Sequence, residues 1–305
     1  MRTVHFDVDS VFNDYFEGEK YSFPITEVTQ VPKPEEIDII TIGAPSFINA
    51  QTLSPYKNLK LVITRSVGID HLNLEDCRQC QVAAYHLEDY GSFNIAEHTI
   101  GLILAGVRNI VSCQKEIKQG IFSYTNFKGI SLQGKTLGII GTGKIGLETI
   151  KMAKVFGLNI LAYDIVTNEQ AVRELGFSYV SLDELLAKSD IISLHTPLTD
   201  QTKHMINKQT IAQMKDGVIL INTARGGLVS TNDLVSSISK FRFVGLDVLE
   251  EEKSFTKDHP LLSFENVVIT PHIAFLTDLS LERIALETQK CIDNFLSGNP
   301  QGRVA

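Results

Sequence analysis

Four polar residues in the second half of the sequence follow apolar, strand-like runs, and their side chains could together move a proton at a carbonyl group. Arg225 stands in the string NTARGGLV, Asp247 and Glu252 stand in VGLDVLEEE, and His272 stands in TPHIAF. A guanidinium group can hold a carboxylate through two hydrogen bonds, and an imidazole can donate or accept a proton near neutral pH. With a hydride donor beside them, these groups could reduce a carbonyl to an alcohol or run that reaction backwards.

Each of these residues also has a structural explanation when it is considered alone. Arg225 could be a surface charge beside a glycine turn, and the acidic run that ends at Glu252 could be a solvated loop. His272 could be a buried histidine with satisfied hydrogen bonds, and Asp247 could begin a turn. Their combination favours a functional site, because the carboxyl ends of strands in a doubly wound sheet gather at one edge, beside the bound cofactor.

The hydride donor is indicated by residues 137–164, which read LGIIGTGKIGLETIKMAKVFGLNILAYD. A strand-like run leads into the turn GTGKIG, and a helical segment and a second strand-like run follow before Asp164. This order is typical of a dinucleotide-binding βαβ unit. In such a unit Gly141 permits the tight turn, Gly143 lets a pyrophosphate approach the backbone, and Gly146 lets the helix pack closely.

Asp164 predicts which dinucleotide binds. It follows Gly146 by 18 residues, at the end of the second strand, where a carboxylate can accept hydrogen bonds from both ribose hydroxyl groups. This carboxylate would repel a phosphate on the 2′ oxygen, so the sequence predicts NAD rather than NADP. A glycine pattern alone also occurs in ordinary loops, but the flanking strands and the acid favour the nucleotide site.

The elements that would position these residues lie within residues 94–275. Six strand-like runs with helical segments between them predict a doubly wound Rossmann domain. These runs are Thr136–Ile140, Ile160–Tyr163, Ile191–Leu194, Val218–Asn222, Phe243–Asp247 and Val267–Ile269. A long helix begins near Asn94, and Asn94 with Glu97 resembles a capping box. The helix is apolar nearly all round, which predicts burial between domains or between subunits.

Residues 1–93 and 276–305 predict a smaller domain of the flavodoxin-like parallel α/β type. Short apolar runs alternate there with polar connections and with segments of helical length such as Val11–Gly18. The runs that predict strands are Thr3–Val8, Ile25–Val28, Ile37–Ile42, Lys60–Ile63 and Val82–Tyr85. An amphipathic helix over Ser280–Leu296 would pack back on this domain. The sequence therefore predicts an α/β fold in which an NAD-binding domain is inserted into a smaller domain, with a ligand-binding cleft between them.

The composition limits the classes of function. Of the 305 residues, 43% are apolar and 21% are charged, as in ordinary globular proteins, and the net charge of −8 argues against a nucleic-acid partner. No run of ~18 apolar residues occurs, and the opening MRTVHFDVDS lacks the apolar stretch of a secretory signal, so we expect a cytoplasmic protein without a membrane partner. Cys77 and Cys80 form one CxxC pair without a second, so the sequence predicts no metal site and leaves a redox pair as the alternative to two chance cysteines.

The chain resembles the D-isomer-specific 2-hydroxyacid dehydrogenases, and within that family it is most similar to the D-lactate dehydrogenase branch. The resemblance covers nearly the whole chain and rests on several strings in the expected order and spacing. These strings are TRSVGIDHLN (64–73), NIAEHTIGLIL (94–104), GTGKIG (141–146), LHTPLTDQTKHMIN (194–207), MKDGVILINTARGGLV (214–229), GLDVLEEE (245–252) and PHIAF (271–275).

The resemblance implies a role for each residue of the site. Arg225 would bind the substrate carboxylate and polarise the carbonyl, and His272 would be the general acid in reduction and the base in oxidation. Glu252 would hydrogen-bond His272 and favour its imidazolium form. Backbone N–H groups of Val67 and Gly68 would help to hold the carboxylate. The residues that would line the cofactor are Lys144, Ile145, Asp164, Thr196, Pro197, Thr202, Thr223, Ala224 and Asp247, the last at the nicotinamide carboxamide.

Phe275 favours a small substrate. It stands three residues after His272, where D-lactate dehydrogenases of this family carry an aromatic side chain that packs on the substrate. The strings SVGIDH and HMIN (204–207) also favour that branch, so pyruvate and D-lactate are the expected pair. Glyoxylate, hydroxypyruvate and a bulkier apolar 2-oxo acid stay open, because one or two methylene groups change binding by only ~1–3 kcal/mol.

Two features depart from the family pattern. Lys253 follows Glu252 where the family usually has proline, which would loosen the loop without removing the carboxylate. The chain is also somewhat short and carries no extra C-terminal regulatory domain, which disfavours the larger phosphoglycerate dehydrogenases.

Other classes of function stay open on the sequence alone. Corepressors related to this family bind NAD(H) and recruit partners, and they can keep Arg225, Glu252 and His272. Formate and phosphite dehydrogenases are also related, but they usually carry glutamine where Glu252 stands. The Glu252–His272 pair therefore favours a substrate whose oxygen gains or loses a proton. Relatives commonly pair through the long apolar helix, so we expect a homodimer.

Overall fold

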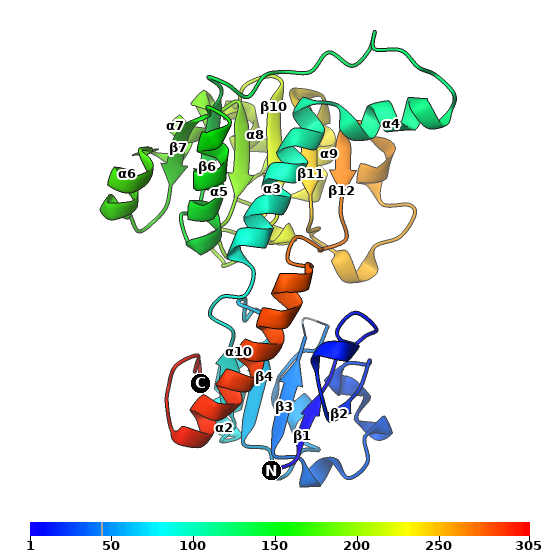
Figure 1. Cartoon of the computed structure of the whole chain (residues 1–305), viewed down its shortest axis with the longest axis vertical. Coiled ribbons are helices and arrows are strands. Elements are labelled where there is room, and N and C mark those ends of the chain that lie inside the picture. The colour runs from blue at the N-terminus through cyan, green and yellow to red at the C-terminus, as the bar shows by residue number, and fades with distance from the viewer. Residues whose placement is uncertain (44) are drawn as a thin grey trace. The chain divides into compact units, whose positions relative to one another are not determined.

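The computed structural model describes residues 1–43 and 45–305, which form two compact units (Figure 1). The first unit comprises Met1–Gly91 and Leu276–Ala305, and the second comprises Ser92–Phe275. Each unit is built on one sheet, of five strands in the first and seven in the second. The strands pair in parallel, and parallel pairs need crossover connections that are usually helical. The predicted α/β class with two parallel sheets is confirmed.

The sheet of the first unit has the order β2-β1-β3-β4-β5, which is the flavodoxin-like order. Its strands are β1 (Thr3–His5), β2 (Glu19–Lys20), β3 (Ile39–Ile42), β4 (Leu61–Thr64) and β5 (Ala83–His86), with the short helices α1 (Ala50–Leu53) and α2 (Leu74–Gln79) between them. Every residue of β3 and β4 is buried. Strands covered on both faces need apolar side chains on both, which explains why these two read as nearly unbroken apolar runs.

The two ends of the chain build the first unit together. Helix α10 (Asp278–Ser297) packs against β4, as the red helix beside the blue strands in Figure 1 shows. Beyond this helix, the Val304 N–H donates to Ala84 O and the His86 N–H donates to Gly302 O, both at 2.8 Å. The last residues of the chain thus bond to the edge strand β5.

One strand predicted for the first unit is wrong. Ile25–Val28 is not a strand, because Ile25–Gln30 forms a 3₁₀ helix, η2, with a kink at Glu27. Ile25 is buried while its two successors are exposed, and so short an apolar pattern fits a helical turn as well as a strand. The place at the sheet edge is taken by the two-residue strand β2, and the helical part of Val11–Gly18 is the single turn η1 (Asn13–Tyr15).

The sheet of the second unit has the order β12-β11-β10-β9-β6-β7-β8. Counted along the chain from β6, this is the Rossmann order 3-2-1-4-5-6 with a further strand after the sixth. Its strands are β6 (Thr136–Ile140), β7 (Asn159–Tyr163), β8 (Ser178–Tyr179), β9 (Ile191–Leu194), β10 (Val218–Asn222), β11 (Phe241–Leu246) and β12 (Val267–Ile269). The helices that follow α3 in this unit are α4 (Ile110–Lys118), α5 (Lys144–Val155), α6 (Glu169–Leu175), α7 (Leu182–Lys188), α8 (Lys208–Gln213) and α9 (Thr231–Ser236). The edge strand β8 was not predicted.

Helix α3 (Ser92–Val107) packs inside the second unit, on α5 and on strands β10 and β11. Gly106 marks a close approach, since a Cβ at this position would lie 2.3 Å from the ring of Phe243. These contacts explain much of the apolar character of the helix without a subunit partner. The predicted capping box is wrong, because α3 begins at Ser92 and the buried Asn94 lies inside its first turn.

Side chains of β10 alternate between two apolar clusters, one on each face of the second sheet. Ile219 and Ile221 belong to the cluster under α3 and α5, while Val218 and Leu220 belong to the cluster on the other face. Both faces of the sheet are therefore covered. A ligand site is expected at the carboxyl ends of the strands.

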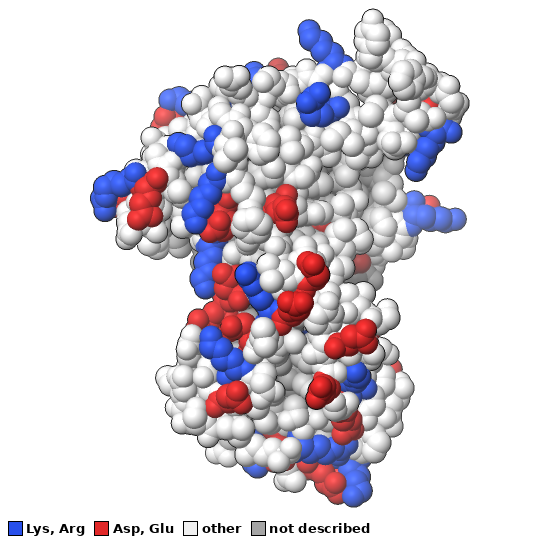
Figure 2. Space-filling view, viewed as in Figure 1, with Lys and Arg blue, Asp and Glu red and all other residues white. Residues whose placement is uncertain are grey.

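The length of the helices and the distribution of surface charge bear on contacts with membranes and charged partners. In the described part of the chain, the helices fall short of the length and apolar character that a membrane crossing needs. On the face that Figure 2 shows, acidic and basic side chains are interspersed.

Candidate active site

Strands β10, β11 and β12 bring the predicted proton-transfer residues to one edge of the second sheet. The three strands are neighbours and run parallel. Arg225 follows β10, Glu252 follows β11, and His272 follows β12. Because the carboxyl ends of parallel strands lie at the same edge, the three loops are neighbours as well.

Glu252 and His272 form a hydrogen-bonded pair across two of these loops. Glu252 Oε2 lies 3.0 Å from His272 Nδ1, and Glu252 Oε1 accepts the N–H of Leu249 at 3.2 Å. Both side chains are partly exposed, at 39% for Glu252 and 41% for His272. The contact uses Nδ1 of the imidazole and leaves Nε2 for a substrate oxygen.

The charge on Glu252 is set by opposing effects. Partial burial favours the neutral carboxyl, whereas the hydrogen bond and charge of His272, the N–H of Leu249 and the charge of Arg225 favour the carboxylate. The favourable effects prevail and hold the pKa of Glu252 below its usual range. The ionised Glu252 can therefore accept a hydrogen bond from Nδ1–H of His272 and hold the ring in this orientation.

Asp247 holds the loop that carries His272. Its carboxylate accepts the N–H groups of Ile273 (3.0 Å) and Ala274 (2.8 Å) and the hydroxyl of Thr270 (2.5 Å). The backbone O of Asp247 accepts the N–H of His272 at 2.8 Å. These bonds keep His272 at φ 55°, a left-handed conformation that a residue with a side chain adopts only when its surroundings fix it.

The sequence did not indicate that His98 of α3 joins this network. His98 Nε2 lies 3.0 Å from Thr270 Oγ1 and 3.6 Å from Asp247 Oδ1. The side chain of Asp247 has no exposed surface, so the expected contact with a nicotinamide carboxamide stays a prediction. One signal could have indicated His98: it is a titratable residue in the first half of a helix whose second half is apolar.

The turn that carries Arg225 is fixed from inside the unit. The buried Asn222 side chain accepts the N–H of Ala224 (3.0 Å) and donates to the carbonyl of Arg225 (2.9 Å). Arg225 Nη1 donates to Ala224 O at 2.8 Å. Gly226 is packed so closely that a Cβ there would lie 1.8 Å from the carbonyl oxygen of Leu249. Asn222 thus positions the turn, although the sequence indicated it only as the last residue of a strand.

The glycine turn after β6 has the geometry of a phosphate site. Gly141 has φ 97°, and a Cβ at Gly146 would lie 2.1 Å from Gly141 O. At Gly143 a Cβ would meet no atom within 4 Å, so this residue faces open space. Gly143 is also the N-cap of α5, where helix N–H groups and the positive dipole end favour an anion. The residues present therefore fit the pyrophosphate of a dinucleotide.

Asp164 at the end of β7 is tied to this turn. Its Oδ2 accepts both the N–H (2.6 Å) and the hydroxyl (3.0 Å) of Thr142, and its Oδ1 accepts the N–H of Val166 at 3.2 Å. The hydroxyl of Tyr179, on the unpredicted strand β8, lies 2.7 Å from Thr142 Oγ1. A carboxylate has about four acceptor sites, so this orientation leaves capacity for ribose hydroxyl groups.

The other residues expected at the cofactor lie at the start of α5 and on the loops after β9 and β10. Lys144 and Ile145 are the first two residues of α5. After β9, the Thr202 hydroxyl donates to Pro197 O at 2.7 Å and so closes the loop that begins with Thr196. After β10, Thr223 Oγ1 lies 2.9 Å from Thr99 Oγ1 of α3, and Ala224 follows it.

Phe275 and the pair Val67–Gly68 belong to different units. The ring of Phe275 lies 6.4 Å from the ring of His272, at an interplanar angle of 85°. In the first unit, Val67 O accepts His86 Nδ1 at 2.9 Å and Gly68 O accepts a neighbouring serine hydroxyl at 2.6 Å. These bonds fix the turn after β4, and the substrate contacts of all three residues stay predictions.

Comparison with known sequences finds the family that the motifs of the sequence resemble. Residues 100–274 match the family described as D-isomer specific 2-hydroxyacid dehydrogenase, NAD binding domain. A hydroxypyruvate reductase from Thermotoga maritima is 38% identical over 255 residues, which are 83% of this chain and 82% of that protein. A D-3-phosphoglycerate dehydrogenase from Methanocaldococcus jannaschii is 36% identical over 251 residues, 81% of this chain and 48% of that protein. The chain spans about half the length of the phosphoglycerate dehydrogenases that it matches.

Comparison with solved structures extends the likeness to both units. The crystal structure of D-lactate dehydrogenase from Aquifex aeolicus, complexed with NAD and lactic acid, matches with a TM-score of 0.87. The two sequences are 36% identical, and the match covers 99% of this chain and 97% of that one.

Proposed function

Because the chain belongs to the D-isomer-specific 2-hydroxyacid dehydrogenase family, we propose that it is an NAD-dependent oxidoreductase acting on small D-2-hydroxy acids. The observation that carries this proposal is the hydrogen bond between Glu252 and His272, which stand on the loops after β11 and β12. The loop after the neighbouring strand β10 carries Arg225. The glycine turn lies at the same edge of the sheet, so a nucleotide and these side chains would be neighbours. Bound NADH would supply the hydride for reduction of a 2-oxo acid.

His272 moves the proton in this proposal. In reduction, Nε2–H of the imidazolium donates a proton to the carbonyl oxygen of the substrate, which becomes a hydroxyl group. In oxidation, neutral Nε2 accepts the proton of that hydroxyl. Glu252 holds the ring through Nδ1 and stabilises its charged form, which is supported by the 3.0 Å contact and by the lowered pKa of Glu252.

Arg225 binds the substrate in this proposal. Its guanidinium group would hold the carboxylate of the 2-oxo acid and polarise the carbonyl that receives the hydride. Support comes from its turn, which Asn222 and the close contact at Gly226 keep in one conformation. The N–H groups of Val67 and Gly68 in the first unit are proposed as further donors to the same carboxylate.

The cofactor of the proposal is NAD. The glycines Gly141, Gly143 and Gly146 would bind its pyrophosphate, and Asp164 would accept hydrogen bonds from the adenosine ribose. The orientation of Asp164 by Thr142 supports this assignment.

We favour pyruvate and D-lactate as the substrate pair. The aromatic ring of Phe275 lies edge-on to His272, where it could pack on a methyl group, and the Aquifex aeolicus enzyme resembles both units. Similar relatives have other names, among them hydroxypyruvate reductase, glyoxylate reductase and D-3-phosphoglycerate dehydrogenase. These substrates and a bulkier apolar 2-oxo acid are therefore the alternatives.

The first test follows the loss of NADH absorbance when the purified protein meets pyruvate, glyoxylate, hydroxypyruvate, its 3-phosphate and a bulkier apolar 2-oxo acid. NADPH replaces NADH in one control, and His272→Ala is the control for the site. Fast NADH-dependent turnover on pyruvate supports the full proposal, and faster turnover on another acid changes its substrate. Tight NADH binding without turnover on any acid would contradict it and favour an NAD(H)-sensing binding protein.

We also propose a homodimer. Because α3, the helix that was expected to pair, packs on α5, β10 and β11, we place the contact between the two copies on α4 and the segment that follows it. Figure 1 shows this part of the chain extending away from the second sheet. It carries apolar side chains that are 43% to 94% exposed, namely Ile110, Val111, Ile117, Ile121, Phe122 and Tyr124. Such a patch favours a protein partner, and light scattering of wild type and Phe122→Asp would test for a dimer. The cytoplasmic location stays a prediction.

A further inference from the structure

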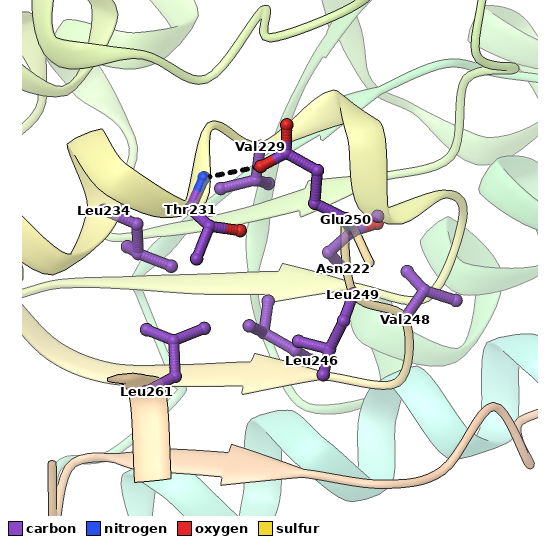
Figure 3. Close-up of a pocket in the computed structure, with 10 residues that line it drawn as sticks. Asn222, Val229, Thr231, Leu234, Leu246, Val248, Leu249, Glu250 and Leu261 are labelled. Atoms are coloured by element: carbon purple, nitrogen blue, oxygen red, sulfur yellow. Dashed lines mark hydrogen bonds between the residues drawn. The ribbon is translucent and has the colours of Figure 1, made fainter. Parts of the chain in front are cut away.

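Glu250 and His204, two residues outside the proposed reaction, form a hydrogen-bonded pair beside the Arg225 turn. One oxygen of Glu250 contacts His204 Nε2, and the other accepts the N–H of Thr231 at 3.0 Å, the bond drawn in Figure 3. Partial burial opposes ionisation of Glu250. The N–H of Thr231 and the contact with His204 outweigh burial and hold the pKa of Glu250 below its usual range.

Glu250 lies on the loop that leads from Asp247 to Glu252. Its neighbour Leu249 donates its N–H to Glu252 Oε1 at 3.2 Å. The carbonyl of Leu249 lies against Gly226, where a Cβ would be only 1.8 Å away. A shift of the backbone at residues 249 and 250 would therefore move Glu252 on one side and collide with the Arg225 turn on the other.

The packing around Glu250 leaves little room for such a shift. Figure 3 shows Glu250 among side chains from β10, β11, α9 and the loop after β11. These side chains line a partly open pocket of about 10 Å³. A cavity of this size holds one water molecule at most. The loop is thus closely packed on its inner side, and the bonds of the Glu250 carboxylate hold it on the outer side.

His204 is joined to the residues that directly follow Arg225. Its N–H donates to Gly227 O at 2.8 Å, and the N–H of Ile206 donates to Leu228 O at 3.0 Å. His204 has φ 52°, and Asn207 Nδ2 donates to its carbonyl at 2.8 Å. The imidazole therefore presents a fixed contact point for Glu250.

We propose that Glu250 and His204 are positioning residues that hold the loop of Glu252 at a fixed distance from the turn of Arg225. The Glu250–His204 contact completes a closed ring of contacts. Residues 204–206 bond to residues 227–230, residue 226 packs on residue 249, and residue 250 bonds to residues 204 and 231. This inference rests on the proposed function. It assigns the pair to turnover of the 2-oxo acid and not to binding of NADH.

The test compares Glu250→Ala, His204→Ala, the double variant and His204→Gln with wild type. We expect kcat for the preferred 2-oxo acid to fall about 10-fold to 100-fold in each alanine variant, because a displacement of about 1 Å at reacting groups has effects of this size. The KM for NADH should change less than about twofold. The kcat of the double variant should fall no further than the kcat of a single variant, because both substitutions break the same contact. His204→Gln keeps a donor near the position of Nε2 and should recover part of the loss.

Asp190→Asn is the matched control. Asp190 lies in the same unit, pairs with Lys215 at 3.0 Å and accepts the N–H of Thr136 at 2.9 Å, as Glu250 does with its partners. The exposed fractions of the two acidic side chains are also similar, at 26% for Asp190 and 28% for Glu250. The control should lower Tm without lowering kcat. If the Glu250 and His204 variants behave like it, the inference is overturned.

A second readout does not need activity. The NMR chemical shifts of the His272 ring in wild type, Glu250→Ala and Asp190→Asn report whether Glu252 still contacts Nδ1. We expect Glu250→Ala, and not the control, to change these shifts, because a displaced Glu252 no longer bonds to Nδ1. If wild type reduces no 2-oxo acid, the proposed function fails, but this measurement still decides the inference. Unchanged shifts in Glu250→Ala would overturn it.

Discussion

Glu252 and His272 come from loops after neighbouring strands and meet through one contact of 3.0 Å between Glu252 Oε2 and His272 Nδ1. Glu252→Gln keeps the length of this side chain and removes the charge that favours imidazolium. Because reduction of a 2-oxo acid uses the protonated ring, we expect the alkaline decline of the reduction rate to move to lower pH. The measurement is kcat/KM with NADH from about pH 5 to about pH 10. An unmoved alkaline decline would contradict the role of Glu252.

Arg225→Ala should damage both binding and turnover of the 2-oxo acid. The guanidinium would make two charge-assisted hydrogen bonds to the carboxylate, so we expect kcat/KM to fall roughly 100-fold to 10 000-fold. Steady-state kinetics with varied oxo acid checks this. The control is Arg242→Ala, which removes a guanidinium that donates to Lys128 O in the same unit. Near-normal turnover in Arg225→Ala would refute the assignment.

Asp164→Ala should change the choice of cofactor. Without the carboxylate, NADH loses an acceptor for its ribose hydroxyls and NADPH loses a repulsion, so the ratio of their KM values should shift about 10-fold or more toward NADPH. Thr142→Val removes one of the two donors that orient Asp164 and keeps the N–H bond of 2.6 Å. It should cause a smaller shift in the same direction. An unchanged ratio in Asp164→Ala would argue against the ribose contact.

Asp247→Ala should destabilise the second unit as well as inactivate it. The substitution removes the acceptor of three hydrogen bonds on the loop of residues 270–274, and buried donors without partners are costly. We expect the free energy of unfolding to fall by about 3 kcal/mol or more. Urea denaturation followed by circular dichroism measures this, and Asp247→Asn, which keeps one acceptor oxygen, should lose less. A wild-type midpoint in Asp247→Ala would show that other contacts hold the loop.

The first unit should lose stability in mild acid through His5. Burial, with the charges of Arg65 and Lys20, lowers the pKa of this histidine to about 4 from a usual value of 6.5. Below about pH 6.5 the unfolded chain binds a proton here that the folded unit does not. The free energy of unfolding therefore decreases as pH falls toward 4, with a slope that approaches ~1.4 kcal/mol per pH unit, and above about pH 6.5 this contribution is constant.

His5→Gln provides the comparison for that acid effect. Glutamine does not titrate, so urea denaturation at several pH values should show a flatter acid slope in this variant than in wild type. The substitution also removes the hydrogen bond of His5 Nδ1 to Thr41 Oγ1, which is 2.8 Å long, so the comparison uses the acid slope and not the absolute stability. Parallel slopes in the two proteins would assign the acid loss to other groups.

The sequence predicted best the strands that are buried on both faces. The limits of β6, β9 and β10 agree with the predicted runs, because covered parallel strands are written as continuous apolar residues. The limits of the half-buried edge strand β12 agree as well. The strands β2 and β8 were missed, since each has two residues and lies at a sheet edge. Ile25 shows the reverse error, in which a buried residue of a helical turn suggested a strand.

The catalytic residues that could be predicted without the family resemblance lie on loops that follow strands. Arg225, Glu252 and His272 were found in this way, because strand order brings such residues to one edge. His98 and Asn222 were missed, since their contacts with Thr270 and with Ala224 depend on tertiary packing and on a side chain that turns back. The same limit hid the burial of Asp247 and its bonds to the loop of residues 270–274.

The position of the chain ends within the first unit has a consequence for biosynthesis. Residues 92–275 form a continuous stretch that contains the whole second sheet, so a ribosome releases everything this unit needs before it makes α10. The first unit lacks its closing helix until α10 has been made. The hydrogen bonds of β5 to the end of the chain also wait for Gly302 and Val304. Domains usually fold in the order of their synthesis. In this protein the unit that is begun first is the one that is finished last.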